Sequence, residues 1–169
     1  MTVDASRFRQ VLGRFATGVT IVTTRNGNTI SGLTVSAFCS VSLEPPLVLV
    51  CIERRNNTCD LIDVSGIYAV SILAEDQQYL SRCFATTKSE KYDAFCGAEY
   101  FTRITGAPIL QGCIAYLDCQ VEARYPGGDH TIFLGRVLDL GLGENGRAEA
   151  SPLLYFRGRY ERLGHHEER

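Results

Sequence analysis

The chain of 169 residues lacks a strong excess of charge of either sign and lacks long apolar runs. Its 17 lysines and arginines oppose 19 aspartates and glutamates, and the basic residues are scattered along the sequence. This argues against a nucleic acid as partner, because nucleic-acid-binding proteins concentrate positive charge on one face. No apolar stretch approaches the roughly 18 residues of a membrane span, and the start of the chain holds no apolar signal core. We therefore expect no membrane association and a cytoplasmic location.

Paired cysteine motifs are also absent, although the chain has seven cysteines. None are spaced as Cys-x-x-Cys, the pattern typical of zinc sites and dithiol redox centres, and the number is odd. In a chain without an export signal this predicts free thiols rather than a disulfide framework. Most of the cysteines lie among apolar residues, where a buried thiol acts as a small hydrophobe. Cys39 lies among hydroxyl residues instead, and a redox-sensing regulator is an alternative function that rests on this residue alone.

Signatures of several common enzyme classes are missing as well. No Gly-x-Gly-x-x-Gly follows a strand, which argues against a dinucleotide bound in the Rossmann manner. No nucleophile elbow surrounds a serine, and two of the three histidines lie near the end of the sequence. A catalytic triad and a metal site are therefore poorly supported, and we expect no metal. With no internal repeat and no low-complexity linker, the length predicts a single domain over 1–169, with a core from about 7 to 163.

The residues that are present predict one early helix followed mainly by strands. Apolar residues from Phe8 to Phe15 recur at helical spacing, so an amphipathic helix is expected to end near 17–18. Asn26-Gly27 is a hairpin turn signal between two β-branched runs. Further strands are expected over 47–52, 68–73, 113–125, 131–140 and 153–160, and helices after Thr58, over 75–84 and over 89–95.

Turns of the hairpin type join most of these strands, and the helices are inserted rather than alternating regularly with them. This pattern favours a mainly β fold with inserted helices, an antiparallel barrel, over a doubly wound α/β sheet. Residues 85–112 have the least regular pattern, and so long a connection often carries function.

The most distinctive segment runs from Gly32 to Cys51, where small hydroxyl residues lie between two strand-like apolar runs. Small side chains there would let a flat ring approach backbone N–H and C=O groups. Taken alone, such a row of hydroxyls is equally typical of a strand facing water. Asn57-Thr58, which follows Arg54 and Arg55, is suited to a phosphate at a helix start, although such a pair is more often only a helix cap. Together these features predict a phosphorylated planar ligand.

The turn at 126–131 is the other unusual feature, because Pro-Gly-Gly-Asp leads into His130 just before an apolar strand. A hairpin in which glycine and aspartate supply positive φ angles, with a solvated histidine beside it, explains the same residues. Spacing alone therefore leaves the role of His130 open.

Three sequence blocks make the chain resemble the short-chain flavin reductases, the reductase components of two-component monooxygenases such as 4-hydroxyphenylacetate 3-monooxygenase. The blocks are 15–24, 32–50, and Gly128-Asp129-His130-Thr131 with 133–135 and 152–156, and the similarity spans about 7–163. The resemblance implies a split β-barrel of Greek-key type and a homodimer with flavin near the subunit interface. It also implies NAD(P)H-dependent reduction of FMN or FAD, with reduced flavin passed to a separate oxygenase.

The same resemblance implies roles for particular segments. Residues 34–42 are expected to wrap the isoalloxazine and ribityl chain, 57–58 to meet phosphate, 81–84 to line the flavin, and 155–160 to close the pocket. His130 is expected to orient the nicotinamide for hydride transfer to flavin N5. The implied cofactor-binding residues are Thr34, Val35, Ser36, Ala37, Cys39, Ser40, Val41, Ser42, Arg54, Asn57, Thr58, Arg82, Phe84, Gly128, Asp129, His130, Tyr155 and Tyr160.

An alternative of a different class is a flavin-binding electron carrier without pyridine-nucleotide turnover. FMN or FAD as the flavin, and NADH or NADPH as the donor, are likewise left open by the sequence.

Overall fold

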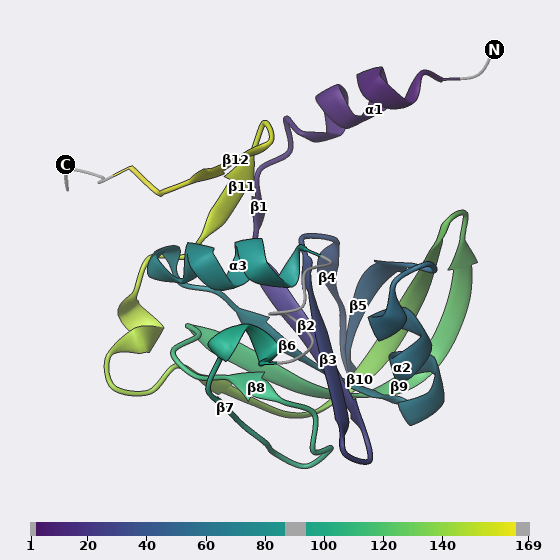
Figure 1. Ribbon diagram of the computed structural model, residues 1–169, viewed down its shortest axis with the longest axis vertical. Coiled ribbons are helices and arrows are strands. Elements are labelled where there is room, and N and C mark those ends of the chain that lie inside the picture. The colour runs from purple at the N-terminus through teal and green to yellow at the C-terminus, as the bar shows by residue number, and fades with distance from the viewer. Residues whose placement is uncertain (1–2, 87–93, 165–169) are drawn as a thin grey trace.

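The computed structural model describes residues 3–86 and 94–164 (Figure 1). The helices are α1 (Ala5–Leu12), α2 (Asn57–Ser65) and α3 (Gln78–Phe84), and three short 3₁₀ turns are η1 (Glu75–Gln77), η2 (Phe95–Gly97) and η3 (Arg147–Glu149). The strands are β1 (Thr17–Gly18), β2 (Thr20–Asn26), β3 (Thr29–Val35), β4 (Phe38–Leu43), β5 (Pro46–Glu53), β6 (Ile67–Ile72), β7 (Tyr100–Phe101), β8 (Ile109–Leu110), β9 (Ala115–Gly127), β10 (His130–Leu142), β11 (Leu154–Phe156) and β12 (Arg159–Glu161).

Seven of these strands form one antiparallel sheet in the order β3-β2-β6-β9-β10-β5-β4. Hairpins account for β2–β3, β4–β5 and β9–β10, whereas β6–β9 and β5–β10 join strands that are distant in sequence. A smaller sheet has the order β1-β11-β12. The prediction of a mainly β, antiparallel fold with inserted helices is therefore confirmed.

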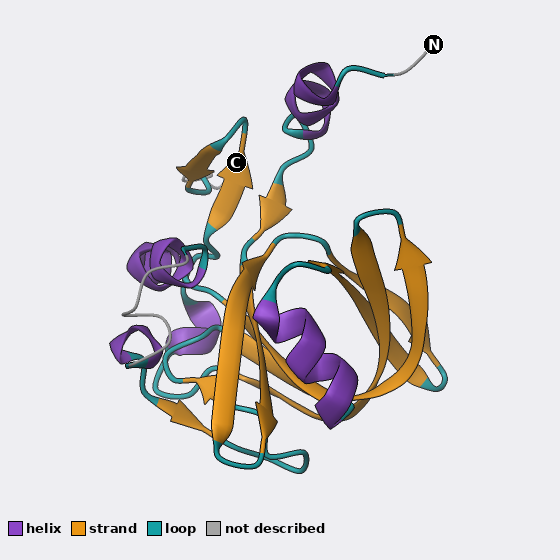
Figure 2. Ribbon diagram, turned by 45° about the vertical axis from the view of Figure 1, so that its right-hand side comes forward, coloured by secondary structure: helices purple, strands orange, loops and turns teal. Residues whose placement is uncertain are grey.

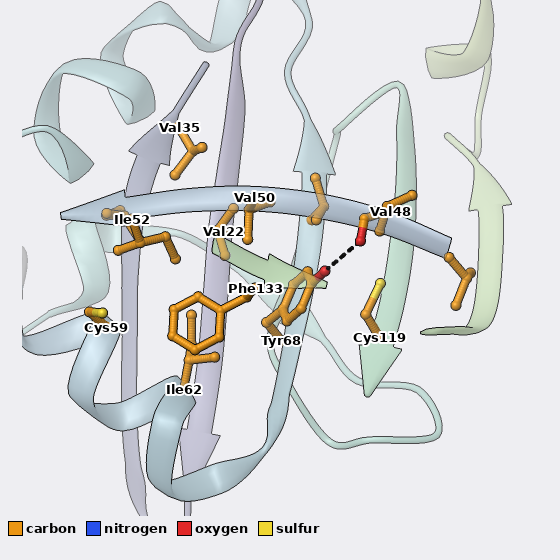
Figure 3. Packing of buried hydrophobic residues seen from close by; sticks show 13 residues of the cluster. Val22, Val35, Val48, Val50, Ile52, Cys59, Ile62, Tyr68, Cys119 and Phe133 are labelled. Atoms are coloured by element: carbon orange, nitrogen blue, oxygen red, sulfur yellow. Dashed lines mark hydrogen bonds between the residues drawn. The ribbon is translucent and has the colours of Figure 1, made fainter. Parts of the chain in front are cut away.

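The main core lies on the concave side of the curved sheet, where α2 packs against it (Figure 2). Figure 3 shows Ile62 of α2 beside Phe133 of β10, with Tyr68 of β6 next to them. All three side chains are fully buried, and the Tyr68 hydroxyl donates to the Val48 carbonyl at 3.5 Å. A Cβ on Gly135 would overlap that hydroxyl, so glycine leaves the space that Tyr68 fills.

Helix ends differ from the sequence prediction in two places. The first helix ends at Leu12 rather than near 17–18, because Thr17 and Gly18 pair with β11 as strand β1. The helix expected over 75–84 is divided into η1 and α3. The helix expected over 89–95 falls mostly outside the described residues, and Phe95 belongs to η2.

The cysteines confirm the predicted burial for three residues and correct the prediction of free thiols. Cys59, Cys113 and Cys119 are buried, as expected, and burial raises the pKa of the Cys113 thiol to about 11 and that of Cys119 to about 12. However, Cys83 and Cys96 form a disulfide, so the prediction of free thiols is wrong for this pair. The two residues are 13 apart in sequence and meet because the turn η2 packs against α3, which no spacing rule signals.

Candidate functional site

A hydroxyl cluster links β3, α3 and the β11–β12 hairpin. The Thr34 hydroxyl donates to the Ser81 carbonyl at 2.6 Å, and the hydroxyls of Ser81 and Tyr160 lie 2.8 Å apart. The Arg82 guanidinium stacks on the Tyr160 ring, with 5.4 Å from its carbon to the ring centroid. Tyr155 packs edge-on against the same ring. The fold thus brings together four predicted site residues from three separate parts of the chain.

Ser81 is the residue at the centre of this cluster, and it is fully buried. The resemblance pointed to segment 81–84 as a whole and gave Ser81 no individual role. A serine inside a helix is ordinary in sequence terms, and only its two partners in space reveal its position between Thr34 and Tyr160.

The predicted segment 36–42 lies at an edge of the sheet. Ser36 and Ala37 connect β3 to β4, and the Ala37 carbonyl accepts from the Cys51 N–H at 3.0 Å. Within the seven-stranded sheet β4 pairs with β5 alone, so its other side leaves backbone N–H and C=O groups unpaired by strands. Cys39, Ser40 and Val41 are exposed, and a β-bulge between Ser40 and Ser42 interrupts the pairing. This edge presents small side chains and backbone polar groups, as a flat polar ring requires.

The start of α2 differs from the prediction. Asn56, not Thr58, is the N-cap, and its side-chain oxygen accepts from the Thr58 N–H at 3.0 Å. Thr58 is buried, and its hydroxyl lies 2.7 Å from that of Ser31 on β3. The Thr58 hydroxyl therefore faces the protein interior, whereas Asn57 is exposed and remains accessible to a ligand.

The turn between β9 and β10 lies against the end of β5. The Arg54 N–H donates to the Asp129 carbonyl at 3.0 Å, and His130 pairs with Glu53 in the β5–β10 register. Nδ1 of His130 lies 2.7 Å from the Asp129 carboxylate. This hydrogen bond, followed by the charge of His130, holds the pKa of Asp129 below its usual range.

Two shallow cavities adjoin this turn and share one arginine, Arg54. One, of about 340 Å³, is lined by Glu53, Arg54, Arg55, Gly128 and Asp129. The other, of about 350 Å³, lies between α2 and the β9–β10 hairpin. Residues more than 70 positions apart in sequence, such as Arg55 and Asp129, therefore line the same part of the surface.

Two predicted site residues belong to the core instead. Val35 is 5% exposed and packs in the cluster under α2. Phe84 is fully buried, and its ring occupies the space that a side chain at Gly32 would need. Their side chains face the core, so any contact with a flavin would come from their backbone groups, and their place in the site stays a prediction. Apolar residues at the ends of a strand and a helix look alike in sequence whether they face a ligand or the core.

A larger cavity, of about 540 Å³, lies elsewhere, between the β7–β8 hairpin and η3. None of the predicted site residues lines it. The carboxylates of Asp139 and Glu144 lie 3.6 Å and 3.9 Å from Arg103, and Asp76 accepts two hydrogen bonds from Arg147. Its arginines are thus engaged within the fold, and we place the candidate site at the hydroxyl cluster, the β4 edge and the β9–β10 turn.

Two properties of the described residues bear on other kinds of site. No cluster of three or more His, Cys, Asp or Glu side chains among them could hold a metal ion. Their helices are also too short and too polar to cross a bilayer.

Comparison with known proteins gives consistent results along nearly the whole chain. Residues 12–164 match the family model described as "Flavin reductase like domain". The chain is 42% identical over 158 residues to the reductase subunit HsaB of a flavin-dependent monooxygenase from Rhodococcus jostii, covering 94% of this chain and 77% of that protein. It is 40% identical over 164 residues to an NADH-dependent flavin reductase from a Rhodococcus species, covering 95% and 88%.

A solved structure agrees with these sequence matches. The nitrilotriacetate monooxygenase component B of Mycobacterium thermoresistibile superposes with a TM-score of 0.89 at 35% identity, covering 97% of this chain and 89% of that one. Both kinds of comparison agree with the resemblance found in the three sequence blocks, and the chain belongs to the flavin reductase like domain family.

Proposed function

We propose that this protein is an NAD(P)H:flavin oxidoreductase, which reduces FMN or FAD by hydride transfer to flavin N5 and supplies the reduced flavin to a partner monooxygenase. Strand β5 is the observation that carries the proposal. It pairs with β4 on one side and β10 on the other, and Arg54 to Asn57 follow directly at its end. Strand β5 therefore connects the β4 edge, Arg54 and Arg55, and the Asp129-His130 turn in one part of the fold.

The chemistry requires positioning more than reactive side chains. The nicotinamide supplies the hydride and the flavin ring accepts it, so the protein has to hold the two rings face to face. Backbone N–H groups along the β4 edge are suited to donate to polar atoms of the flavin ring and to stabilise negative charge there. The hydrogen bond between the hydroxyls of Ser81 and Tyr160 supports a second wall for this site, formed by α3 and the β11–β12 hairpin.

Asp129 and His130 are assigned to the nicotinamide. The Asp129 carboxylate holds Nδ1 of His130, which leaves Nε2 free to hydrogen-bond a carboxamide or a phosphate oxygen. For the flavin phosphate, we assign Arg54 and Asn57, which are exposed, in place of the buried Thr58 hydroxyl.

We also infer that the curved sheet is a split β-barrel and that two copies form a homodimer. The outer face of β5, β9 and β10 supports the second point, because apolar residues there remain half-buried or exposed among the described residues. This outer apolar face consists of Leu47, Leu49, Cys51, Ala123, Tyr125, Ile132 and Leu134, which are half-buried or exposed. A solvated sheet face normally carries polar residues, and a second copy of the same face would bury these side chains symmetrically.

Steady-state oxidation of NADH and NADPH, with FMN, FAD or riboflavin in excess, tests the enzymatic proposal. When a suitable flavin is added, we expect the protein to oxidise many equivalents of NADH or NADPH per protein molecule. An electron carrier would instead consume about one equivalent and stop, and this result would overturn the proposal. The spectrum of the purified protein distinguishes flavin as substrate from flavin as bound cofactor, since only the latter is yellow.

A further inference from the structure

The Cys83–Cys96 disulfide joins two surface elements, the last turn of α3 and the turn η2. The Cα atoms are 5.9 Å apart, and both residues are half-buried rather than enclosed in the core. All seven cysteines of the sequence lie within the described residues, and this is the one disulfide among them. Three of the others are buried and unsuited to reaction with solutes.

The η2 side of this pair has an unfavourable backbone conformation. Phe95 and Cys96 have φ angles of +47° and +57°, a region that favours glycine. Packing holds Phe95 in place, because its ring meets Phe84 at 5.0 Å and Tyr100 at 5.6 Å, both edge-on. The disulfide adds a covalent tie at the next residue. In the reduced protein, no covalent bond restrains Cys96 at its positive φ angle.

The α3 side of the pair adjoins the candidate site. Cys83 lies two residues after Ser81, whose carbonyl accepts from Thr34 and whose hydroxyl meets Tyr160. Arg82, directly before Cys83, stacks on the Tyr160 ring. A tie at Cys83 therefore restrains the helical turn that positions Ser81 and Arg82.

We propose that Cys83 and Cys96 are a peroxide-responsive dithiol, whose oxidation to the disulfide fixes α3 and strengthens flavin binding. The source of peroxide rests on the proposed function, because reduced flavin that meets oxygen yields hydrogen peroxide. Disulfides in proteins of reducing compartments are commonly transient, which suits a pair that forms only under oxidation.

The reaction is balanced between one peroxide and two thiols. One sulfur attacks the peroxide, the O–O bond breaks, and a sulfenic acid and one water form. The second thiol then displaces the sulfenic oxygen as a second water, and the S–S bond forms. The sulfurs are oxidised, the peroxide oxygens are reduced, and both thiol protons end in water. Tighter flavin retention in this state would limit further escape of reduced flavin into solution.

Thiol counting and flavin binding on the full chain test the proposal. After dithiothreitol, alkylation followed by intact mass should count seven thiols, and after added hydrogen peroxide five, with peptide mapping to Cys83 and Cys96. The oxidised protein should bind FMN or FAD at least about threefold more tightly by fluorescence titration. Its Tm should be higher by about 5–10 °C, as expected for closing a loop of this length.

Variants separate this pair from the other cysteines. Cys83→Ser and Cys96→Ser should each abolish both responses to peroxide, whereas Cys113→Ser, at a free cysteine outside the candidate site, should retain them. Seven thiols after peroxide, a disulfide at other residues, or equal flavin affinity in both states would each overturn the proposal. The thiol count uses added peroxide and needs no turnover, so it tests the dithiol even if the enzymatic proposal fails. The comparison of oxidised and reduced wild-type protein remains informative even if a variant does not fold.

Discussion

Asp129 and His130 are neighbours in sequence whose side chains contact each other at the start of β10. In His130→Ala, we expect flavin affinity to stay nearly unchanged while hydride transfer from NADH slows by about ten- to a hundredfold, as for loss of a positioning contact. Stopped-flow reduction of bound flavin measures the transfer, and equilibrium titration measures the affinity. Asp129→Asn, which keeps the size of the side chain, should give a smaller loss. Reduction at the wild-type rate in His130→Ala would remove this residue from the mechanism.

Gly135 is a residue whose importance lies in packing. In Gly135→Ala the new methyl group would overlap the Tyr68 hydroxyl inside the core, so either the ring or strand β10 has to move. We expect a loss of about 1–3 kcal/mol in the free energy of unfolding, as for other overpacked cores. Urea denaturation measures this loss. Gly18→Ala is the matched control, because no atom lies within 4 Å of its added Cβ, and equal stability of the two variants would contradict this account.

The sequence predicts a residue's role well when neighbouring residues carry the chemistry, and poorly when distant residues do. Neighbouring residues of suitable chemistry made three features recognisable in the sequence. These are the hydroxyl-rich segment from Gly32 to Cys51, Arg54 and the Asp129-His130 turn. The contacts of Ser81 were not recognisable, since its partners Thr34 and Tyr160 lie 47 and 79 positions away. The burial of Phe84 was not visible in the sequence for the same reason, because burial depends on partners that lie elsewhere in the chain.

Asp76 and Arg147 connect two elements, η1 and η3. The carboxylate accepts from Nη1 at 2.9 Å and from Nη2 at 2.7 Å, and these bonds are the main cause of its lowered pKa. A carboxyl whose pKa is lower in the folded state stabilises the fold above its unfolded pKa and loses this effect as the pH falls through the folded value. Because the side chain is 62% exposed, solvent screens the pair, and we expect only about 0.5–1 kcal/mol.

The variant Asp76→Asn tests this link directly. It should be less stable than the wild type at pH 7. The difference should begin to shrink below about pH 4, where the unfolded chain takes up a proton, and should vanish once the pH falls below the lowered pKa of the folded carboxyl. Urea denaturation at several pH values measures the two curves. Glu44→Gln, in the turn between β4 and β5, is a control for the loss of a surface charge. A difference that stays constant with pH would mean that the ion pair is not its source.

The elements themselves were mostly predictable, since alternating and β-branched runs and the Asn26-Gly27 turn determine strands locally. Their ends were less so. Strand β1 exists only because β11, more than 130 residues later, pairs with it, and the first helix stops early for that reason. α1 itself has no buried residue and projects beside the β11–β12 hairpin (Figure 1), although its sequence has the apolar spacing of a packed helix.

The whole molecule has an outer apolar face that we assign to a second copy. In Leu134→Glu, a charge replaces an apolar side chain at the centre of this face, so the homodimer should dissociate. Size-exclusion chromatography with light scattering measures the mass in solution. Val64→Glu changes an exposed apolar residue on α2 instead and should leave the mass unchanged. A wild-type chain that is already monomeric would contradict the assignment of this face.

The order of strands in the sheet has a consequence for synthesis on the ribosome. Residues 20–72 can form three pairings as they emerge, β2–β3, β4–β5 and β2–β6, but β5 and β6 each keep one open edge until β9 and β10 arrive. Open strand edges favour association between nascent chains, and such distant pairings form slowly. A nascent chain arrested before Ala115 should therefore be cleaved readily by protease, and resistance should appear only once residues beyond Leu142 have left the ribosome.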